Sequence, residues 1–254
     1  MKLAAMQPYF FPYLGYFQLI SAVDKFILYD RLNYIRQGWV NRNRILPVHG
    51  HPTYLVVPLK NQSVYSKISD ILIDNRTNWR RKTCRQIEMN YRKSFFFDQV
   101  FPLVEETLAG KEDHLTGLNG ATTRAVCDFL EIPTEIVTDV SGYKALEIEL
   151  EKSDSALIAS YVRQQQLADI KTIRVLEICK KENAATYINA IGGQALYDKN
   201  VFARNGIELY FIQSQPYTYQ QRSKEFFPNL SILDVLMNCG KAGTQQLLND
   251  YELI

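Results

Sequence analysis

The sequence predicts an α/β fold with a mostly parallel sheet that starts with a βαβ unit. An apolar run over 2–7, a helical pattern over 14–23 and a second apolar run over 25–29 follow one another at the N-terminus. Strands joined by a helix in this way are parallel, with a right-handed crossover. Strand and helix patterns alternate again towards the C-terminus, with a helical stretch between. This favours a single α/β domain over 1–254 with a mostly helical insertion or subdomain over 76–182.

The βαβ unit is predicted from the spacing of its apolar residues. Lys2–Gln7 (KLAAMQ) has the length and composition of a short buried strand. In the helix that follows, one face at i, i+3, i+4 and i+7 is apolar and consists of Tyr16, Leu19, Ile20 and Val23. The second strand (KFILY) is closed by an aspartate, which ends the apolar run and completes the unit.

The remaining elements are predicted in the same way, helices from the spacing of apolar residues at i, i+3 and i+4 and strands from short apolar or alternating runs. Residues 31–51 are polar and basic with interleaved aromatic side chains, and we expect a loop there. Further strands are predicted over 53–59, 68–73, 135–138, 186–189 and 207–212. Further helices are predicted over 79–91, 100–108, 118–130, 156–166, 169–182 and 232–237.

Charge and cysteine content narrow the class of protein. The 29 Lys and Arg residues nearly balance 27 Asp and Glu, and a net charge of +2 gives no strong field to attract nucleic acid. The four cysteines are widely spaced without a C-x-x-C pair, which is typical of reduced thiols in the cytosol. Prolines and Gln7 interrupt the apolar run over 1–23, and no other segment is long enough to span a bilayer. We therefore expect a cytoplasmic protein with no membrane span and no nucleic-acid partner.

The strongest candidate for a binding site is the segment 6–17 (MQPYFFPYLGYF), which joins the first strand to the first helix. In open parallel sheets ligands bind outside the carboxyl ends of the strands, and a helix N-terminus there offers free N–H groups to an anion. Gln7 would place an amide in this crevice, and Gly15 would allow a ligand or another backbone to approach closely. The walls would be aromatic, formed by Tyr9, Tyr13 and Tyr16. The alternative is a rigid proline turn whose rings only pack together.

A second candidate segment follows the second strand. Asp30 lies at the carboxyl end of that strand, and the stretch 31–44 mixes arginine, asparagine and aromatic side chains. Arginine can bind a carboxylate or phosphate through two hydrogen bonds, asparagine suits a sugar hydroxyl, and tryptophan can stack on a sugar face. The predicted binding residues here are Tyr34, Arg36, Trp39, Asn41, Arg42 and Asn43. The alternative is a solvated basic loop.

Candidate catalytic groups are few. The three histidines are His49, His51 and His114. Because no cysteine or carboxylate lies close in sequence to the His-x-His pair, no metal site is predicted. General-base catalysis would then depend on one of three carboxylates, Asp24, Asp30 or Asp234. The alternative for the last of these is structural, since Ser231 and Asp234 fit a variant capping box at a helix start.

Segments near both ends of the chain resemble the WbqC-like family. The first group comprises 6–17, Asp24, Asp30 and the stretch 39–45 (WVNRNRI), and the second comprises 217–220, 227–234 and 238–240. The resemblance implies a product of bacterial O-antigen, lipopolysaccharide or capsule gene clusters. It also implies a transferase that modifies a nucleotide-activated amino sugar by acyl or aminoacyl transfer to the sugar amine. Matching positions in the second group implicate three more residues in binding, namely Tyr219, Gln220 and Ser231.

The first turn has a fainter resemblance as well. Residues 11–16 (FPYLGY) are similar in layout to the Pro-x-His-x-Gly-His turn of nucleotidylyltransferases and pantothenate synthetase, with Tyr13 and Tyr16 at the histidine positions. One alternative function is therefore an adenylate-forming ligase with a degenerate ATP turn. Another is a non-catalytic module that binds a nucleotide sugar or a pathway enzyme.

The resemblance also sets expectations for cofactors and partners. The resemblance assigns no particular bound cofactor. The acyl or aminoacyl donor that it implies would be coenzyme A, a carrier protein or an ATP-activated amino acid. The expected partners are a nucleotide-linked sugar and enzymes of the same pathway. The oligomeric state stays open.

Overall fold

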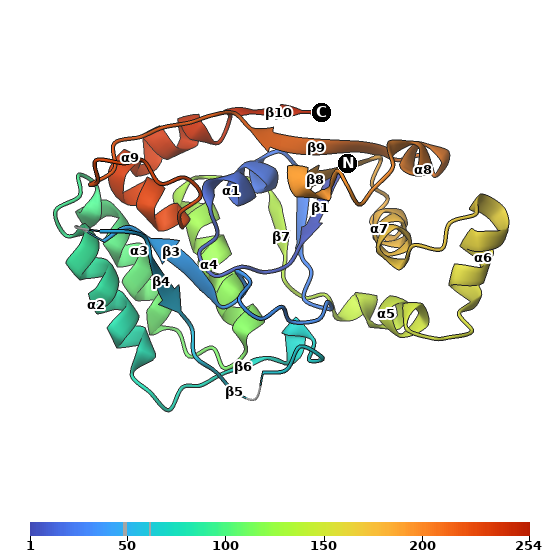
Figure 1. The fold of residues 1–254 in the computed structure, drawn as a ribbon, viewed down its shortest axis with the longest axis horizontal. Coiled ribbons are helices and arrows are strands. Elements are labelled where there is room, and N and C mark those ends of the chain that lie inside the picture. Colours follow the sequence, from blue (N-terminus) through green and yellow to red (C-terminus); the bar gives the residue numbers. More distant parts are fainter. Residues whose placement is uncertain (48–49, 61) are drawn as a thin grey trace.

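A computed structural model describes residues 1–47, 50–60 and 62–254. Its main sheet has six strands in the order β10-β9-β8-β1-β2-β7 (Figure 1). These strands are β1 (Lys2–Met6), β2 (Lys25–Leu28), β7 (Glu135–Val137), β8 (Thr186–Ala190), β9 (Glu208–Ser214) and β10 (Tyr251–Leu253). All neighbours pair in parallel except β10, which runs antiparallel to β9 at the edge. The predicted α/β fold with a mostly parallel sheet and an opening βαβ unit is therefore confirmed.

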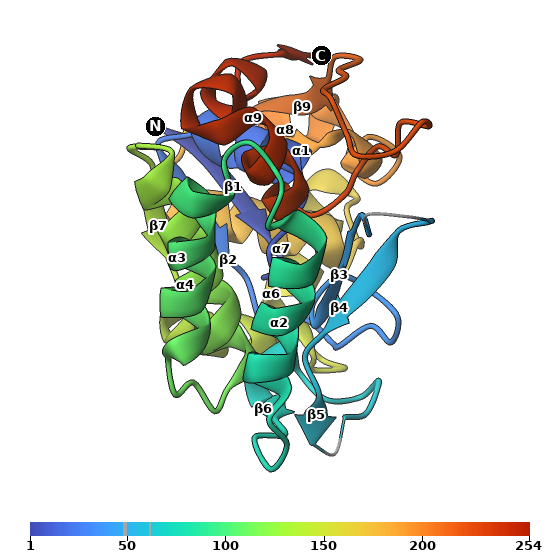
Figure 2. The same cartoon turned by 90° about the vertical axis from the view of Figure 1, so that its left-hand side faces the viewer.

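Helices cover both faces of this sheet. They are α1 (Leu14–Ser21), α2 (Trp79–Tyr91), α3 (Phe97–Ala109), α4 (Leu115–Phe129), α5 (Lys144–Leu150), α6 (Ala156–Gln165), α7 (Ile170–Lys181), α8 (Lys199–Arg204) and α9 (Ile232–Leu247). Side chains alternate along a strand, so Ala4 and Phe26 pack with α1–α4 and α9, whereas Leu3 and Ile27 pack with α5–α8. Figures 1 and 2 show these two helical layers on opposite sides of the strands.

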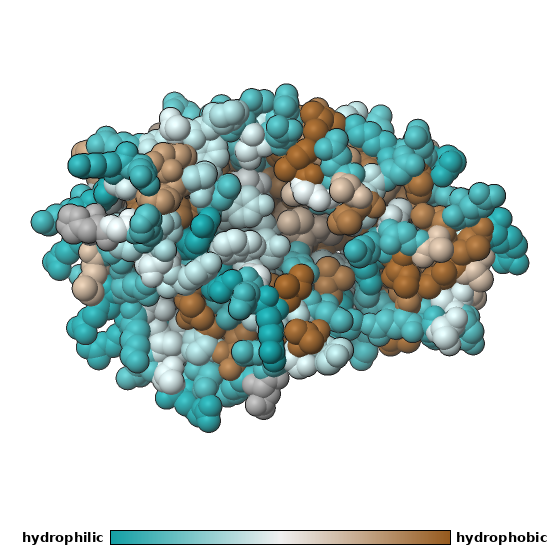
Figure 3. All heavy atoms as spheres, viewed as in Figure 1, coloured by the Kyte–Doolittle hydropathy of each residue, from teal (hydrophilic) through white to brown (hydrophobic). Residues whose placement is uncertain are grey.

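Residues 76–182 contribute to both layers and to the sheet itself. The helices α2–α4 cover one face, α5–α7 cover the other, and β7 forms one edge of the main sheet. On the face seen in Figure 3, hydrophobic side chains gather over α5–α7, where Ile148 and Val162 are exposed. Among the described residues, no helix is long and apolar enough to cross a membrane.

The order of the strands reverses beside β1. From β1 the chain proceeds outward through β2 to β7, and it then returns to the other side of β1 to form β8 and β9. Ligands in open α/β sheets bind at such a reversal, in the crevice outside the carboxyl ends of the two diverging strands. The crevice here lies beyond Met6 and Ala190, where the loop into α1 begins.

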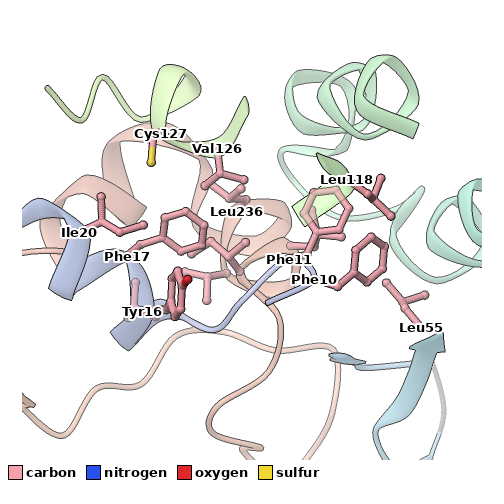
Figure 4. Close-up of a cluster of buried hydrophobic side chains, with 14 of the residues drawn as sticks. Phe10, Phe11, Tyr16, Phe17, Ile20, Leu55, Leu118, Val126, Cys127 and Leu236 are labelled. Carbon is pink, nitrogen blue, oxygen red and sulfur yellow. The ribbon is translucent and has the colours of Figure 1, made fainter. Parts of the chain in front are cut away.

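An aromatic cluster fixes the start of α1 above the sheet. Phe10, Phe11 and Phe17 are fully buried against Leu236 of α9 and Leu118 of α4 (Figure 4). Burying such side chains contributes roughly 1.5–3 kcal/mol each. The proline-bracketed loop is therefore held rigidly by its own rings, and α1 begins at Leu14 at the carboxyl edge of the sheet.

Several elements differ from the predictions. A strand, β3 (Arg42–Ile45), lies inside the predicted loop and pairs antiparallel with β4 (Thr53–Val56), beside α2 (Figure 2). The strand predicted over 68–73 is a 3₁₀ turn followed by the short β6 (Leu72–Ile73), which pairs with β5 (Leu59–Lys60). The elements α5, α8 and β10 were not predicted; each is at most seven residues long, too short for a clear apolar period.

Candidate functional site

A pocket of about 460 Å³ opens at the reversal of the strand order. It is bounded by the start of α1, the β3 strand with the turn before it, the ends of β8 and β9, and the loop before α9. The lining residues predicted from the sequence are Tyr13, Gly15, Trp39 and Asn43. Arg44, Ser214 and Asn229 also line it and were not predicted. Residues of the two N-terminal candidate segments and of the stretch 227–234, which the family resemblance marked, thus meet at one pocket.

The first turn of α1 gives the pocket a positive end. Tyr13 is the N-cap residue but its side chain accepts no capping hydrogen bond, and the first turn holds no acidic residue. The positive end of the helix dipole therefore lies beside the pocket, although the Tyr16 N–H already donates to the Tyr13 carbonyl at 3.1 Å. Gly15 is required by packing, since a Cβ there would lie 2.9 Å from Tyr13 Cε2 and 3.1 Å from Ser214 Oγ.

Arg44 supplies the cation of the pocket. Its guanidinium lies 5.5 Å from the centroid of the Trp39 ring, and its Nη2 donates to the Asn229 carbonyl at 3.5 Å. Its Nε is buried without a hydrogen-bond partner among the described residues. A buried guanidinium N–H without an acceptor is costly.

Arg42, the arginine predicted for binding, has other contacts. Its guanidinium lies 4.5 Å from the Tyr54 ring centroid and donates to the carbonyls of Gln37 and Gly38. It therefore stabilises the turn before β3 and lies outside the pocket lining. Sequence patterning could not separate Arg42 from Arg44, because both point to the same face of β3.

Asn43 and Ser231 hold the aromatic loop in a strained shape. Phe11 has a φ of +40°, which is uncommon for a residue with a Cβ. Asn43 Nδ2 donates to the carbonyls of Phe10 (3.2 Å) and Phe11 (2.7 Å), and Ser231 Oγ donates to the Phe11 carbonyl at 2.8 Å. The polar groups of both side chains are thus used inside the protein, where they position the start of α1.

The other predicted binding residues are divided between internal contacts and the surface. Tyr16 is buried and donates to the Gln7 carbonyl at 2.9 Å, with Tyr9 packed on its ring. Tyr34 donates to Asn41 Oδ1 at 2.9 Å. Arg36 and Gln220 are exposed. Tyr16 occupies one of the two histidine positions of the nucleotidylyltransferase turn, so only Tyr13 of that pair lines the pocket.

The three candidate carboxylates lie in different places. Asp24 precedes β2 and accepts from the Lys2 N–H at 2.7 Å, which puts it at the amino edge of the sheet, opposite the pocket. Asp234 is fully buried in the first turn of α9, bound by Tyr91, Tyr219 and Gln221. Asp30 follows β2 and is the one of the three at the carboxyl edge.

Burial makes Asp30 chemically distinct. The residue is 7% exposed, and its Oδ1 has no hydrogen-bond partner among the described residues. Burial raises the pKa of this carboxyl to about 6, opposed by Arg31 at 3.8 Å. A carboxyl that titrates near neutral pH in a sheet-edge position is suited to proton transfer.

Replacing Asp30 is expected to change the pH dependence of folding. Because its folded pKa is raised, the folded state binds the proton more tightly, and stability falls as pH rises from about 4 to about 6. Asp30→Asn should remove that slope and exceed the wild-type stability at pH 7 by about 1–2 kcal/mol, after allowance for solvent screening. Urea denaturation across this pH range measures both. The exposed Asp24→Asn serves as control, and a wild-type slope in Asp30→Asn would contradict the burial argument.

Comparison with known proteins identifies the family of this chain. The model of the WbqC-like protein family matches residues 7–246. The chain belongs to the WbqC-like family. It is 30% identical over 242 residues to the uncharacterized protein Rv1507c of Mycobacterium tuberculosis, covering 94% of each chain. No solved structure matches it significantly.

In this WbqC-like chain the characteristic segments are joined directly by backbone hydrogen bonds. The Phe10 N–H donates to the Trp39 carbonyl at 3.2 Å. The N–H groups of Ser231 and Ile232 each donate at 2.8 Å, to the carbonyls of Arg44 and Pro12 respectively. Backbone hydrogen bonds therefore hold together three parts of the sequence that each contribute lining residues to the pocket.

Metal-binding groups do not gather in this region. In the described ranges, no group of three or more His, Cys, Asp or Glu side chains is placed to hold a metal ion. His51 packs edge-on against Phe227 at 5.9 Å, and His49 lies outside the described residues.

Proposed function

We propose that the pocket binds a nucleotide-linked amino sugar, and that the protein is a transferase which adds an acyl or aminoacyl group to the sugar amine in surface-polysaccharide biosynthesis. The observation that supports this most is the position of the pocket, at the reversal of strand order, with an uncapped helix N-terminus and Arg44 facing it. Membership of the WbqC-like family supports the biological setting.

The pocket offers a partner for each part of such a ligand. The diphosphate would accept hydrogen bonds from the first turn of α1 and from Arg44, whose Nε is without a partner among the described residues. The Trp39 ring provides an apolar face for a sugar. Amide groups of Gln213 and Asn229 in the lining are suited to hydroxyl groups.

Asp30 is the proposed general base for the transfer. The amine would attack the acyl carbon of a thioester or adenylate donor, the C–N bond would form as the donor's leaving group departs, and the carboxylate would take the ammonium proton. Asp30 follows β2, two strand positions or roughly 10 Å from β8, so the amine of the bound sugar would have to reach across the carboxyl ends of β1 and β2 to contact it. Its pKa of about 6 leaves it largely ionised at neutral pH.

A non-catalytic binding module is the second candidate function. Among the described residues that line the pocket, none is a carboxylate, histidine or cysteine. A pocket of that composition can hold a polar ligand without acting on it, and Asp30 is not among its lining residues. The two functions share the ligand and differ in whether the bound sugar is altered.

Replacing Arg44 tests the binding site. Arg44→Met is expected to weaken binding of a UDP-, dTDP- or GDP-linked amino sugar by about 10- to 100-fold, because a charge-assisted hydrogen bond to phosphate is lost. Arg36→Met is the matched control, since it removes an exposed arginine outside the pocket lining and should change affinity by less than about twofold. Isothermal titration calorimetry measures both. Equal effects of the two variants would refute the assignment of Arg44.

Asp30→Asn separates the two functions. A transferase should lose about 100-fold or more of its turnover in this variant while keeping its affinity for the sugar nucleotide. Product formation with acyl-coenzyme A, acylated carrier protein or ATP with amino acids is followed by mass spectrometry. Binding without product under every donor condition would favour the binding module. Absence of binding to any sugar nucleotide would refute both proposed functions.

A further inference from the structure

A basic groove runs along the second half of α2, and its lining shares no residue with the pocket described above. It consists of two adjacent cavities of about 390 and 400 Å³, which share Lys93 and Arg222 in their linings. The first cavity is lined by residues just after α2 and by Asn238 of α9, and the second is lined by Arg85, Glu88 and Met89 of α2. We call the pair the α2 groove.

The charge of the α2 groove is strongly one-sided. Its lining contains the cations Arg85, Arg92, Lys93 and Arg222, and a single carboxylate, Glu88, which pairs with Arg92 at 3.2 Å. Within the described part of the chain, the other three cations make no ion pair. The net charge of the whole chain is only +2, so this density is local and requires a local explanation.

Capping of α2 accounts for only part of this charge. Cations at a helix C-terminus are favourable because they oppose the helix dipole, and Arg222 Nη1 donates to the Asn90 carbonyl at 3.3 Å. Arg85 lies mid-helix, two turns earlier. In the described residues, neither Arg85 nor Lys93 donates to a carbonyl at that end. An unpaired cluster of this kind attracts an anion.

Polar groups extend the floor of the first cavity. Ser94 is 8% exposed, and its Oγ has no hydrogen-bond partner among the described residues. Gln220 is exposed beside it, and Asn238 lines the same cavity from α9, where its Nδ2 donates to the Asp234 carbonyl at 2.7 Å. One ammonium group (Lys93), one guanidinium group (Arg222) and the Ser94 hydroxyl in one cavity lining match the hydrogen-bonding needs of a phosphate.

We propose that the α2 groove is a second ligand site, which binds a phosphate-bearing ligand through Arg85, Lys93 and Arg222. The phosphate could belong to a soluble diphosphate or to a lipid headgroup. Two large apolar side chains also line the groove, Met89 and Phe95, which are 73% and 78% exposed.

Calorimetric titration with pyrophosphate at low ionic strength tests the site. The double variant Arg85→Met/Lys93→Met should bind pyrophosphate at least about tenfold more weakly than wild type, and Ser94→Ala about threefold more weakly. The matched control is Arg163→Met/Lys171→Met, which removes two exposed cations from the opposite helical layer. It should change the affinity by less than about twofold. Thermal melting confirms that each variant is folded.

Arg44→Met distinguishes this site from the pocket at the sheet edge. Loss of pyrophosphate affinity in Arg44→Met, with none in Arg85→Met/Lys93→Met, would place the anion in that pocket and overturn the inference.

Sedimentation with vesicles of phosphatidylcholine and phosphatidylglycerol tests whether the phosphate belongs to a lipid. Vesicle binding that Arg85→Met/Lys93→Met weakens would assign the phosphate to a lipid, and pyrophosphate binding without vesicle binding would assign it to a soluble ligand. Absence of both refutes the site.

Discussion

Gly240→Ala is expected to lower the free energy of unfolding by about 3 kcal/mol or more. Gly240 breaks the middle of α9 with φ 66° and ψ −171°, a backbone conformation that only glycine adopts without strain. A Cβ at this position would also lie 2.5 Å from Cδ1 of Phe96. Backbone strain and the clash with the ring add, because relieving one leaves the other in place.

Urea denaturation measures this loss, and the melting temperature should fall by about 6–12 °C for a chain of this size. Gly192→Ala is the matched control, because an added Cβ there meets nothing within 4 Å, and it should change stability by less than about 0.5 kcal/mol. The double variant Gly240→Ala/Phe96→Ala should be less destabilised than the sum of its single variants, since the clash is absent. Strict additivity would show that the ring does not contribute.

The fold could be predicted where apolar residues keep a regular period. The strands β1 and β2 and the helix α2 have such patterns, and α2 begins and ends at the residues predicted for it. The strand β3 could not be predicted in this way, because one of its two inward positions is Asn43. That amide is buried only because it binds the carbonyls of Phe10 and Phe11, a contact invisible to patterning.

The candidate site could likewise be predicted only in part. The crevice at the carboxyl edge follows from the βαβ unit, and Tyr13, Gly15 and Trp39 line it. The choice between Arg42 and Arg44 depends on which of the two lies near Asn229, and that contact spans 185 residues of sequence. The position of Asp24, in contrast, could be predicted, because a residue that precedes a parallel strand lies at the amino edge of the sheet. The predicted topology therefore already indicated that Asp24 lies away from the crevice.

Asp234→Ala is expected to destabilise the protein by about 3 kcal/mol. The carboxylate is fully buried and accepts hydrogen bonds from the hydroxyls of Tyr91 and Tyr219, both at 2.6 Å, and from Gln221 at 3.3 Å. Removing it leaves the buried Tyr91 hydroxyl and the half-buried Tyr219 hydroxyl without their acceptor, at up to about 1–3 kcal/mol each. The loss is smaller than the sum because burial itself disfavours the ionised carboxyl, whose pKa is raised.

Two further variants decide whether Asp234 has a structural or a catalytic role. Asp234→Asn keeps one acceptor in place and should cost only about 1 kcal/mol. Asp98→Ala makes the same substitution in the first turn of α3 at an exposed position, and it should cost less than about 1 kcal/mol. If Asp234→Ala unfolds like wild type in urea but abolishes turnover, the carboxylate acts on substrate despite its burial. If stability and activity fall together and Asp234→Asn restores both, its role is to anchor Tyr91 and Tyr219 and thereby the end of α2 against α9.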